Sequence, residues 1–251
     1  MNAKAGRTRL DVLLVERGLA ETRQKAQAMI LAGEVSVDGA RADKAGTLVR
    51  GESRVDVQSR LQKYVSRGGF KLEGALADFG VEGTGKICLD VGGSTGGFTD
   101  CLLQHGAVKV YAVDVNIAQM AWKLQQDERV LRVEQNAREL KAEQIGEAVS
   151  LVVMDVSFIS VTKVLAPAIR VAASGAEFLI LVKPQFELRK EDVGRGGIVT
   201  DERLQEEAVN RVWEAATAAG LECNGVKPSH LRGAEGNQEY FLYARKPEQV
   251  G

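Results

Sequence analysis

The chain has 251 residues, of which 27% are charged and 45% hydrophobic, the balance of an ordinary folded globular protein. Its apolar runs are shorter than the roughly 20 residues of a membrane-spanning helix, and its first residues, MNAKAGRTRLD, lack the apolar stretch of a secretion signal. We therefore expect a cytoplasmic protein with no membrane partner.

The cysteines agree with that expectation. There are three of them, Cys88, Cys101 and Cys223, and no two are spaced as C-x-x-C. An odd number without this spacing argues against both a disulfide framework and a zinc site. We predict reduced thiols, with Cys88 buried in a strand, and no bound metal.

Charge is distributed unevenly along the chain. Residues 1–65 contain 12 Lys and Arg against 8 Asp and Glu, whereas the remainder contains 21 against 26. A small basic segment ahead of a mildly acidic one suggests that the first segment binds a polyanion.

The basic segment predicts two helices followed by short strands, a small α+β domain. LDVLLVERGL, residues 10–19, favours a helix that ends at Gly18. Thr22 is placed to cap a second helix, RQKAQAMILA, and Gly33 to end it. EVSVDG at 34–39 alternates and then turns, as a strand entering a hairpin does, and RGESRVDVQ predicts another turn and strand.

A junction follows in QKYVSRGGFKL, residues 62–72. Its two glycines, Gly68 and Gly69, permit a sharp change of direction, and FKLEGALADF predicts a helix over 70–79. We divide the chain into a first domain at 1–62, a linker at 63–66 and a second domain at 67–251.

The second domain repeats apolar runs between helical stretches. Continuous apolar runs indicate strands that are buried on both faces, and their alternation with helices indicates an α/β fold with an open, mostly parallel, doubly wound sheet of the Rossmann-like kind. The seven runs lie at 86–91, 109–115, 130–135, 150–156, 177–183, 221–226 and 239–244.

The stretch LDVGGSTGGFTD, residues 89–100, forms the first turn from strand to helix. It lacks the lysine of a P-loop and the spacing of the dinucleotide fingerprint. Asp114, which ends the next strand, is placed to accept hydrogen bonds from a ribose. An adenosine-containing ligand without a pyrophosphate, such as S-adenosylmethionine, fits both observations. The alternative is a close-packed turn that needs its glycines for steric reasons alone.

The third strand ends at Asn136, which could pair with an adenine edge or simply shape a turn. With Asp155 at the end of the fourth strand, the predicted cofactor residues are Asp90, Gly92, Gly93, Ser94, Gly96, Gly97, Phe98, Asp114, Val115, Asn136, Ala137 and Asp155.

Four charged residues flank this predicted edge of the sheet. Asp155 and Lys183 directly follow apolar strands, Lys71 lies on the preceding helix, and Glu239 begins the last run. A charge at such a position is costly to bury without a partner. Each could be a surface or paired charge, and together they could form a Lys/Asp/Lys/Glu cluster beside the methyl donor.

The chain resembles a known family over nearly its whole length. TRLDVLLVERGLAETRQKAQAMILAGEVSVDGA resembles the RNA-binding domain of the small-subunit ribosomal protein S-four type. SRGGFKL, LDVGGSTGGFTD, VVMDVSFIS, LVKPQFE and GNQEYFLYA match, in order, the TlyA/hemolysin A family, whose catalytic domain is of the FtsJ type. The first resemblance implies that phosphates are contacted by Arg7, Arg9, Arg23, Lys25, Arg41 and Lys44.

The resemblance also implies an activity, methylation of ribosomal RNA at ribose 2′-hydroxyls, commonly of cytidines. It implies catalytic roles for Lys71, Asp155, Lys183 and Glu239. A lysine can take a proton from a hydroxyl only when burial or a neighbouring cation favours its neutral form. We assign Lys183 to that role or to orienting the hydroxyl.

In this interpretation, Lys71 adds a second positive charge, and Asp155 and Glu239 orient the two lysines.

The polar stretch FELRKEDVGRGGIV at 186–199 predicts a loop. With Arg67, its Arg189 and Lys190 could form an RNA-facing rim, or the loop could merely be solvated. The alternatives to an enzyme are a membrane-active hemolysin and a ribosome assembly factor with a silent methyltransferase domain.

Overall fold

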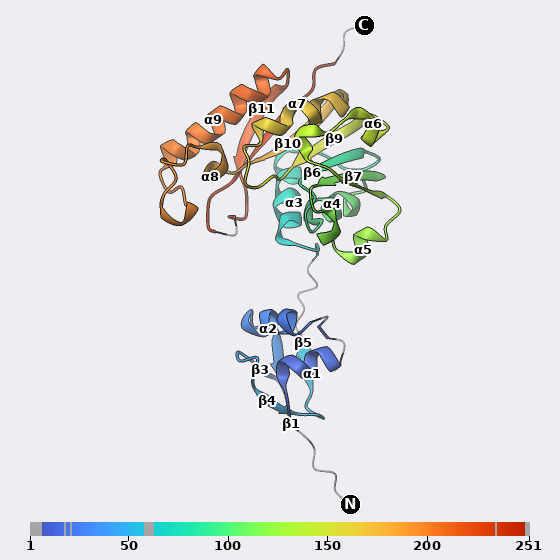
Figure 1. Ribbon diagram of the computed structural model, residues 1–251, viewed down its shortest axis with the longest axis vertical. Coiled ribbons are helices and arrows are strands. Elements are labelled where there is room, and N and C mark those ends of the chain that lie inside the picture. The colour runs from blue at the N-terminus through green and yellow to red at the C-terminus, as the bar shows by residue number, and fades with distance from the viewer. Residues whose placement is uncertain (1–6, 18, 21, 58–62, 234, 249–251) are drawn as a thin grey trace, which may run out of the picture. The chain divides into compact units, whose positions relative to one another are not determined.

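The computed structural model describes residues 7–17, 19–20, 22–57, 63–233 and 235–248 (Figure 1). Two compact units make up the chain, Met1–Lys63 and Tyr64–Gly251. Tyr64 is fully buried in the core of the second unit, and Val65 packs against that core. These two residues of the predicted linker therefore belong structurally to the second unit.

The first unit is a small α+β domain, and its two predicted helices and later strands are confirmed. Thr22 caps the second helix, because its Oγ1 accepts a hydrogen bond from the amide of Lys25 at 3.2 Å. Gly33, with a φ of +72°, follows that helix. Gly18 lies outside the described residues. The elements are β1 (Arg7–Arg9), α1 (Leu10–Glu16), α2 (Arg23–Leu31), β2 (Val35–Val37), β3 (Ala40–Arg41), β4 (Leu48–Arg50) and β5 (Val55–Val57).

The strands of this unit form two small sheets. β1 pairs antiparallel with β4, and β2 pairs antiparallel with both β3 and β5. The predictions missed β1, because its sequence RTR carries no apolar alternation. The core under both sheets consists of buried aliphatic side chains from the helices and strands, among them Leu10, Leu14, Ile30 and Val35.

The second unit contains the predicted seven-stranded sheet, in the order β11-β12-β10-β9-β6-β7-β8. β10, β9, β6, β7 and β8 run parallel, whereas β12 runs antiparallel to its neighbours β10 and β11. Each predicted apolar run corresponds to one strand. The strands are β6 (Ile87–Val91), β7 (Lys109–Asp114), β8 (Val130–Glu134), β9 (Val149–Met154), β10 (Ala172–Val182), β11 (Glu222–Pro228) and β12 (Tyr240–Arg245).

Helices cover both faces of this sheet, as the alternation of buried residues along β6 illustrates (Figure 1). Cys88 packs toward α3 (Arg67–Phe79) and α4 (Gly97–Gln104), and Leu89 packs toward α7 (Thr162–Val171) and α9 (Glu202–Ala218). Burial raises the pKa of the Cys88 thiol to about 12. Within the described residues, no helix is long and apolar enough to cross a membrane. The shorter helices are η1 (Ile117–Gln119), α5 (Trp122–Gln125), η2 (Ala137–Glu139), α6 (Ala142–Ile145), α8 (Pro184–Glu187) and η3 (Arg195–Gly197).

The turn predicted at Gly68 and Gly69 is wrong, because both residues lie in the first turn of α3. Their function is close packing. A Cβ on Gly69 would lie 2.3 Å from the ring of Tyr64, and a Cβ on Gly97, at the start of α4, would lie 2.1 Å from Ser66 Oγ. The amino ends of α3 and α4 can therefore touch only because these positions lack side chains.

The loop predicted over 186–199 is only partly correct. Phe186 and Glu187 form the end of the short helix α8, and Arg195–Gly197 form η3. Glu187 is buried, and it accepts hydrogen bonds from Ser160 Oγ at 2.5 Å and from the Val161 amide at 2.8 Å. A charged residue in a polar sequence gave no sign of this inward orientation.

Candidate active site

Two adjoining cavities open at the carboxyl ends of the parallel strands, where sheets of this topology bind ligands. One measures about 480 Å³ and the other about 150 Å³, and both are lined by Gly92, Ser94 and Asp155. The larger cavity also contacts β7 and the segment after β8. The smaller one lies against the amino ends of α3 and α4.

The glycine loop is fixed tightly to the strands around it. The amides of Gly92 and Gly93 donate to the Val113 carbonyl at 2.9 and 3.1 Å. A Cβ on Gly92, whose φ is +95°, would lie 2.2 Å from the Asp155 carbonyl oxygen. Packing within the protein thus explains why this position requires glycine, which is the steric alternative raised by the sequence. Ligand binding is indicated instead by the two cavities that residues of this loop line.

The larger cavity is lined by the carboxylate predicted to bind a ribose. Asp114 accepts from the Ser94 amide at 3.0 Å and from the Asn116 amide at 2.8 Å, so it also holds the glycine loop. Asn136 uses its side-chain oxygen to cap η2 through the Arg138 amide at 3.1 Å, as the turn alternative requires. Among the other predicted cofactor residues, Val115, Asn136 and Ala137 line this cavity, and Gly93, Gly97 and Phe98 line the smaller one.

Asp90 and Gly96, also predicted as cofactor residues, do not line either cavity in the described structure. Asp90 is fully buried, and its Oδ2 accepts from Thr99 Oγ1 at 2.6 Å. Burial raises the pKa of Asp90 to about 7. Gly96 packs against α5, since a Cβ there would lie 2.2 Å from Leu124 Cδ1. Both residues support the loop from behind.

The four charged residues form two ion pairs. Lys71 Nζ lies 2.5 Å from Glu239 Oε2, and Lys183 Nζ lies 2.5 Å from Asp155 Oδ1. The side chains of both lysines are only 10% exposed, so solvent screens these pairs weakly. Because Val182 pairs with Tyr240 in the antiparallel register, Lys183 and Glu239 occupy the next positions at the same end of two neighbouring strands.

Lys71 and Asp155, one member of each pair, line the smaller cavity. The cavity therefore has a cation and an anion on its wall, each held by a buried partner. Lys183 also donates to Ser157 Oγ at 2.8 Å, so its ammonium group contacts both a carboxylate and a hydroxyl. This arrangement can orient a hydroxyl that enters the cavity and can balance the charge that develops when the hydroxyl loses its proton.

No sequence pattern pointed to Phe158, which is 88% exposed and lines the larger cavity. Its φ of +66° is unusual for an aromatic residue and keeps the ring at the surface. The ring lies 5.5 Å from that of Phe186, on the helix that follows Lys183. An exposed aromatic ring at this place can stack on a flat base. Its position directly after Ser157, which contacts Lys183, is the signal that could have found it.

The predicted RNA-facing residues of the second unit separate into two groups. Arg67 lines the smaller cavity. Arg189 and Lys190 line neither cavity in the described structure; both are exposed, and Arg189 lies 3.8 Å from Glu191. Arg232, which no sequence pattern singled out, also lines the smaller cavity.

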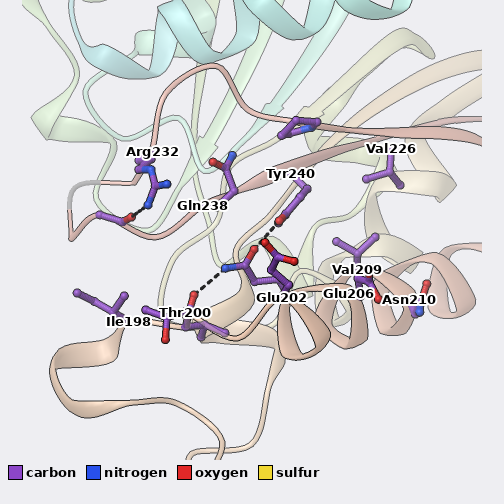
Figure 2. A pocket seen from close by; sticks show the side chains of 14 residues that line it. Ile198, Thr200, Glu202, Glu206, Val209, Asn210, Val226, Arg232, Gln238 and Tyr240 are labelled. Atoms are coloured by element: carbon purple, nitrogen blue, oxygen red, sulfur yellow. Dashed lines mark hydrogen bonds between the residues drawn. The ribbon is translucent and has the colours of Figure 1, made fainter.

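The largest hollow of the second unit, about 960 Å³, lies between α9, β11 and the segment before β12 (Figure 2). Glu202 and Glu206 lie on its α9 wall, and Tyr240 donates to Gln205 Oε1 at 2.5 Å. Arg232 lines both this hollow and the smaller cavity. None of the predicted catalytic or cofactor residues lines it.

In the first unit, a buried carboxylate organises two of the predicted RNA-binding arginines. Asp11 is fully buried and accepts from Arg9 at 3.0 Å, from Arg23 at 3.2 Å and from Gln27 at 2.8 Å. These donors, Arg9 above all, hold the pKa of Asp11 below its usual range. Both arginine side chains remain about half exposed. The other predicted contacts, Arg7, Lys25, Arg41 and Lys44, are exposed.

The lining of the two cavities suits an adenosine-bearing methyl donor. Asp114 supplies a carboxylate for hydroxyls, and Val115 and Ile159 supply apolar contacts for a flat ring. Gly92 lines both cavities and Gly93 lines the smaller one, so both can present backbone to a ligand. The anionic Asp155, shared by both cavities, suits a ligand that carries positive charge between its two ends.

Comparison with known proteins agrees with this geometry. The family model of FtsJ-like methyltransferases matches residues 64–246, and that of the S4 domain matches residues 8–55. The 16S/23S rRNA (cytidine-2′-O)-methyltransferase TlyA of Mycobacterium tuberculosis is 46% identical over 243 residues, which cover 96% of this chain and 91% of the relative. Hemolysin A of Brachyspira hyodysenteriae is 43% identical over 94% of this chain and 98% of its own.

Solved structures show the same architecture. A protein of Streptococcus thermophilus, assigned as a hemolysin, superposes with a TM-score of 0.76 at 37% identity and covers 98% of this chain and 92% of its own. An S-adenosylmethionine-dependent methyltransferase of Mesorhizobium loti superposes with a TM-score of 0.52 at 14% identity, over 70% of this chain and 98% of its own, and so shares the fold. The chain therefore belongs to the FtsJ-like methyltransferases, with an S4 domain ahead of the methyltransferase domain.

Proposed function

We propose that this protein methylates the 2′-hydroxyl of a ribose in ribosomal RNA, at a cytidine, with S-adenosylmethionine as the methyl donor. The observation that carries the proposal is the meeting of two buried lysine–carboxylate pairs, Lys71–Glu239 and Lys183–Asp155, at a cavity beside the glycine loop. The relatives named as rRNA cytidine-2′-O-methyltransferases support the same substrate and reaction.

The protein's own contribution is to hold and align the reactants. S-adenosylmethionine, when bound, supplies an activated methyl group on a sulfonium. We assign Asp114 to its ribose, Val115, Asn136 and Ala137 to its adenine, and the residues of the smaller cavity to its amino-acid end. Alignment of a hydroxyl with that methyl group would supply much of the acceleration.

The two lysines would act on the RNA hydroxyl. Lys183, held by Asp155 and Ser157, would direct a donor to the hydroxyl oxygen. As the O–CH3 bond forms and the bond from methyl to sulfur breaks, the hydroxyl proton would pass to solvent water. Lys71, fixed by Glu239, adds positive charge that stabilises the oxygen as it becomes negative. The carboxylates keep the two lysines in place and are not consumed.

The S4 domain would supply affinity for RNA. Arg9 and Arg23, aligned by Asp11, and the exposed Arg7, Lys25, Arg41 and Lys44 offer contacts to phosphates, which position a protein without reading sequence. Ribosomal RNA, either free or in a ribosomal subunit, is the proposed partner. Arg67, Arg189 and Lys190 would extend the contact near the methylated ribose.

The decisive experiment is transfer of radiolabelled methyl groups to purified large and small ribosomal subunits from a strain that lacks this gene. Wild-type protein should label at least one subunit. Lys183→Ala should lower turnover by roughly 100-fold or more, while calorimetry shows nearly unchanged binding of S-adenosylmethionine. Lys163→Ala, at an exposed position of α7, is the matched control and should behave as wild type.

Two results would count against the proposal. Cofactor binding by the wild-type protein without label on either subunit would indicate another RNA substrate or a silent assembly factor. If Lys183→Ala lost cofactor binding and turnover to the same degree, the role of Lys183 in handling the hydroxyl would be wrong.

A further inference from the structure

The smaller cavity carries an excess of positive charge that the two ion pairs do not use. Its charged lining residues are Arg67, Lys71, Arg232 and Asp155. Lys71 and Asp155 each have a buried counter-charge, Glu239 and Lys183 respectively. Among the described residues, no carboxylate forms an ion pair with Arg67 or Arg232, so two guanidinium charges on the wall of this cavity remain uncompensated.

The two arginines are connected to each other through the backbone. Arg67 Nη2 donates to the Arg232 carbonyl oxygen at 3.2 Å, although 165 residues separate them. Arg232 Nη1 donates to the Gly236 carbonyl at 3.2 Å (Figure 2). A guanidinium has five N–H donors, and these bonds engage a single nitrogen of each. The remaining donors are available for a planar, bidentate acceptor.

The backbone around the arginines favours the same kind of ligand. Ser66 and Gly68, at the amino end of α3, and Gly97, at the amino end of α4, line the cavity with Arg67 and Arg232. The amino end of a helix adds partial positive charge, so it reinforces the field of the two side chains. Asp155, the acid among the residues that line this cavity, forms an ion pair with Lys183.

We propose that Arg67 and Arg232 form an oxyanion-binding site in the smaller cavity, and that Arg232 is a substrate- or cofactor-positioning residue. The proposal rests on the proposed function, which brings two oxyanions to this place: the carboxylate of S-adenosylmethionine and a phosphate of the RNA next to the reacting ribose. Both offer the pair of oxygens that a guanidinium binds. Binding measurements can show which of these two oxyanions occupies the site.

The test uses Arg232→Gln in the full-length protein, with binding measured by calorimetry and without turnover. The probes are S-adenosylmethionine and its decarboxylated form, which keeps the adenosine and the sulfonium but lacks the carboxylate. If the site holds the cofactor, Arg232→Gln should weaken S-adenosylmethionine binding roughly 10- to 100-fold, the effect of one charge-assisted hydrogen bond. Binding of the decarboxylated form should not change.

If the site holds an RNA phosphate, the same substitution should leave binding of both cofactors unchanged. Affinity for in vitro transcribed ribosomal RNA should then fall, and the slope of log affinity against log salt should decrease by about one. Arg232→Lys should recover part of either loss, because it restores charge but not the planar fork. Arg203→Gln, which removes a 90% exposed guanidinium on α9, is the control.

The site assignment would be overturned if Arg232→Gln, with an unchanged melting temperature, altered neither cofactor affinity nor RNA affinity and its salt dependence. Equal weakening of S-adenosylmethionine and its decarboxylated form, without any loss of RNA affinity, would overturn it too. These tests measure binding and not turnover, so their results remain interpretable even if the wild-type protein methylates neither subunit. Failure of the proposed function and failure of the oxyanion site are therefore distinguishable.

Discussion

Asp90 provides a sharp test of how burial acts on stability at the centre of the second unit. Its carboxyl group is fully buried, Oδ2 accepts from Thr99, and Oδ1 has no hydrogen-bond partner in the described structure. Burial raises the pKa of Asp90 from 3.8 to about 7. A group whose pKa is higher in the folded state stabilises the fold at low pH and loses that contribution as the pH rises through the folded value.

The size of the loss follows from these values. Between pH 5 and about 7 the unfolded chain has released the proton of Asp90 while the folded chain retains it. Each pKa unit corresponds to about 1.4 kcal/mol, so the wild-type unit should lose about 3 kcal/mol from this one group between pH 5 and pH 8. Asp90→Asn removes the titration and keeps an acceptor for Thr99. Relative to wild type, the variant should therefore gain about 3 kcal/mol over this interval.

The measurement is urea unfolding of both proteins at pH 5 and pH 8, followed by a signal from the second unit and without cofactor. At each pH, the difference between the free energies of unfolding of the two proteins cancels the contribution of the other titrating groups. Asp127→Asn is a useful contrast, because Arg129 lowers the pKa of Asp127 and removal of that carboxylate gives no gain at pH 8. If the difference between Asp90→Asn and wild type were the same at both pH values, the argument from burial would be refuted.

Three further substitutions test other parts of the structure. Asp11→Asn should reduce RNA affinity several-fold in filter binding, because Arg9 and Arg23 lose the carboxylate that aligns them; unchanged affinity would mean that their alignment does not matter. Phe158→Ala should raise KM for the RNA while the melting temperature stays constant, since the ring is 88% exposed, and a normal KM would exclude a stacking role. Phe178→Ala should destabilise the second unit by about 3–5 kcal/mol in urea unfolding, because its ring is fully buried under the sheet; a loss below about 1 kcal/mol would contradict this packing.

The fold of the second unit could be predicted because a parallel sheet buries both faces of each strand. Runs such as LVVM and FLILV therefore remain apolar without interruption, and they end where the strands end. The same logic located Asp155 and Lys183, because a charge directly after such a run lies at the edge where ligands bind. That these two residues pair with each other, and do not join one continuous cluster of four charges, depends on the order of the strands. This pairing could not be predicted from the sequence.

Other features could not be predicted from the sequence because they depend on tertiary contacts. Gly68 and Gly69 look like a turn in sequence, yet both are helical, and at Gly69 the ring of Tyr64 leaves no room for a Cβ. Glu187 looks like a solvated loop residue until its contacts with Ser160 and Val161 are seen. Arg232 has no local signature at all, because only the path of the segment before β12 brings it to the cavity.

The antiparallel direction of β12 has a consequence for when the enzyme can first act. Because β12 runs against β10, its amino end reaches the edge of the sheet where the two cavities open, and Glu239 contacts Lys71 across 168 residues of sequence. During synthesis, Lys71 thus leaves the ribosome long before the carboxylate that compensates its charge. A chain still being translated can form the glycine loop and β6 to β10, but it cannot yet hold both lysines in place. Methylation should therefore begin only after β12 has docked, which makes activity a strict indicator that the second unit is completely folded.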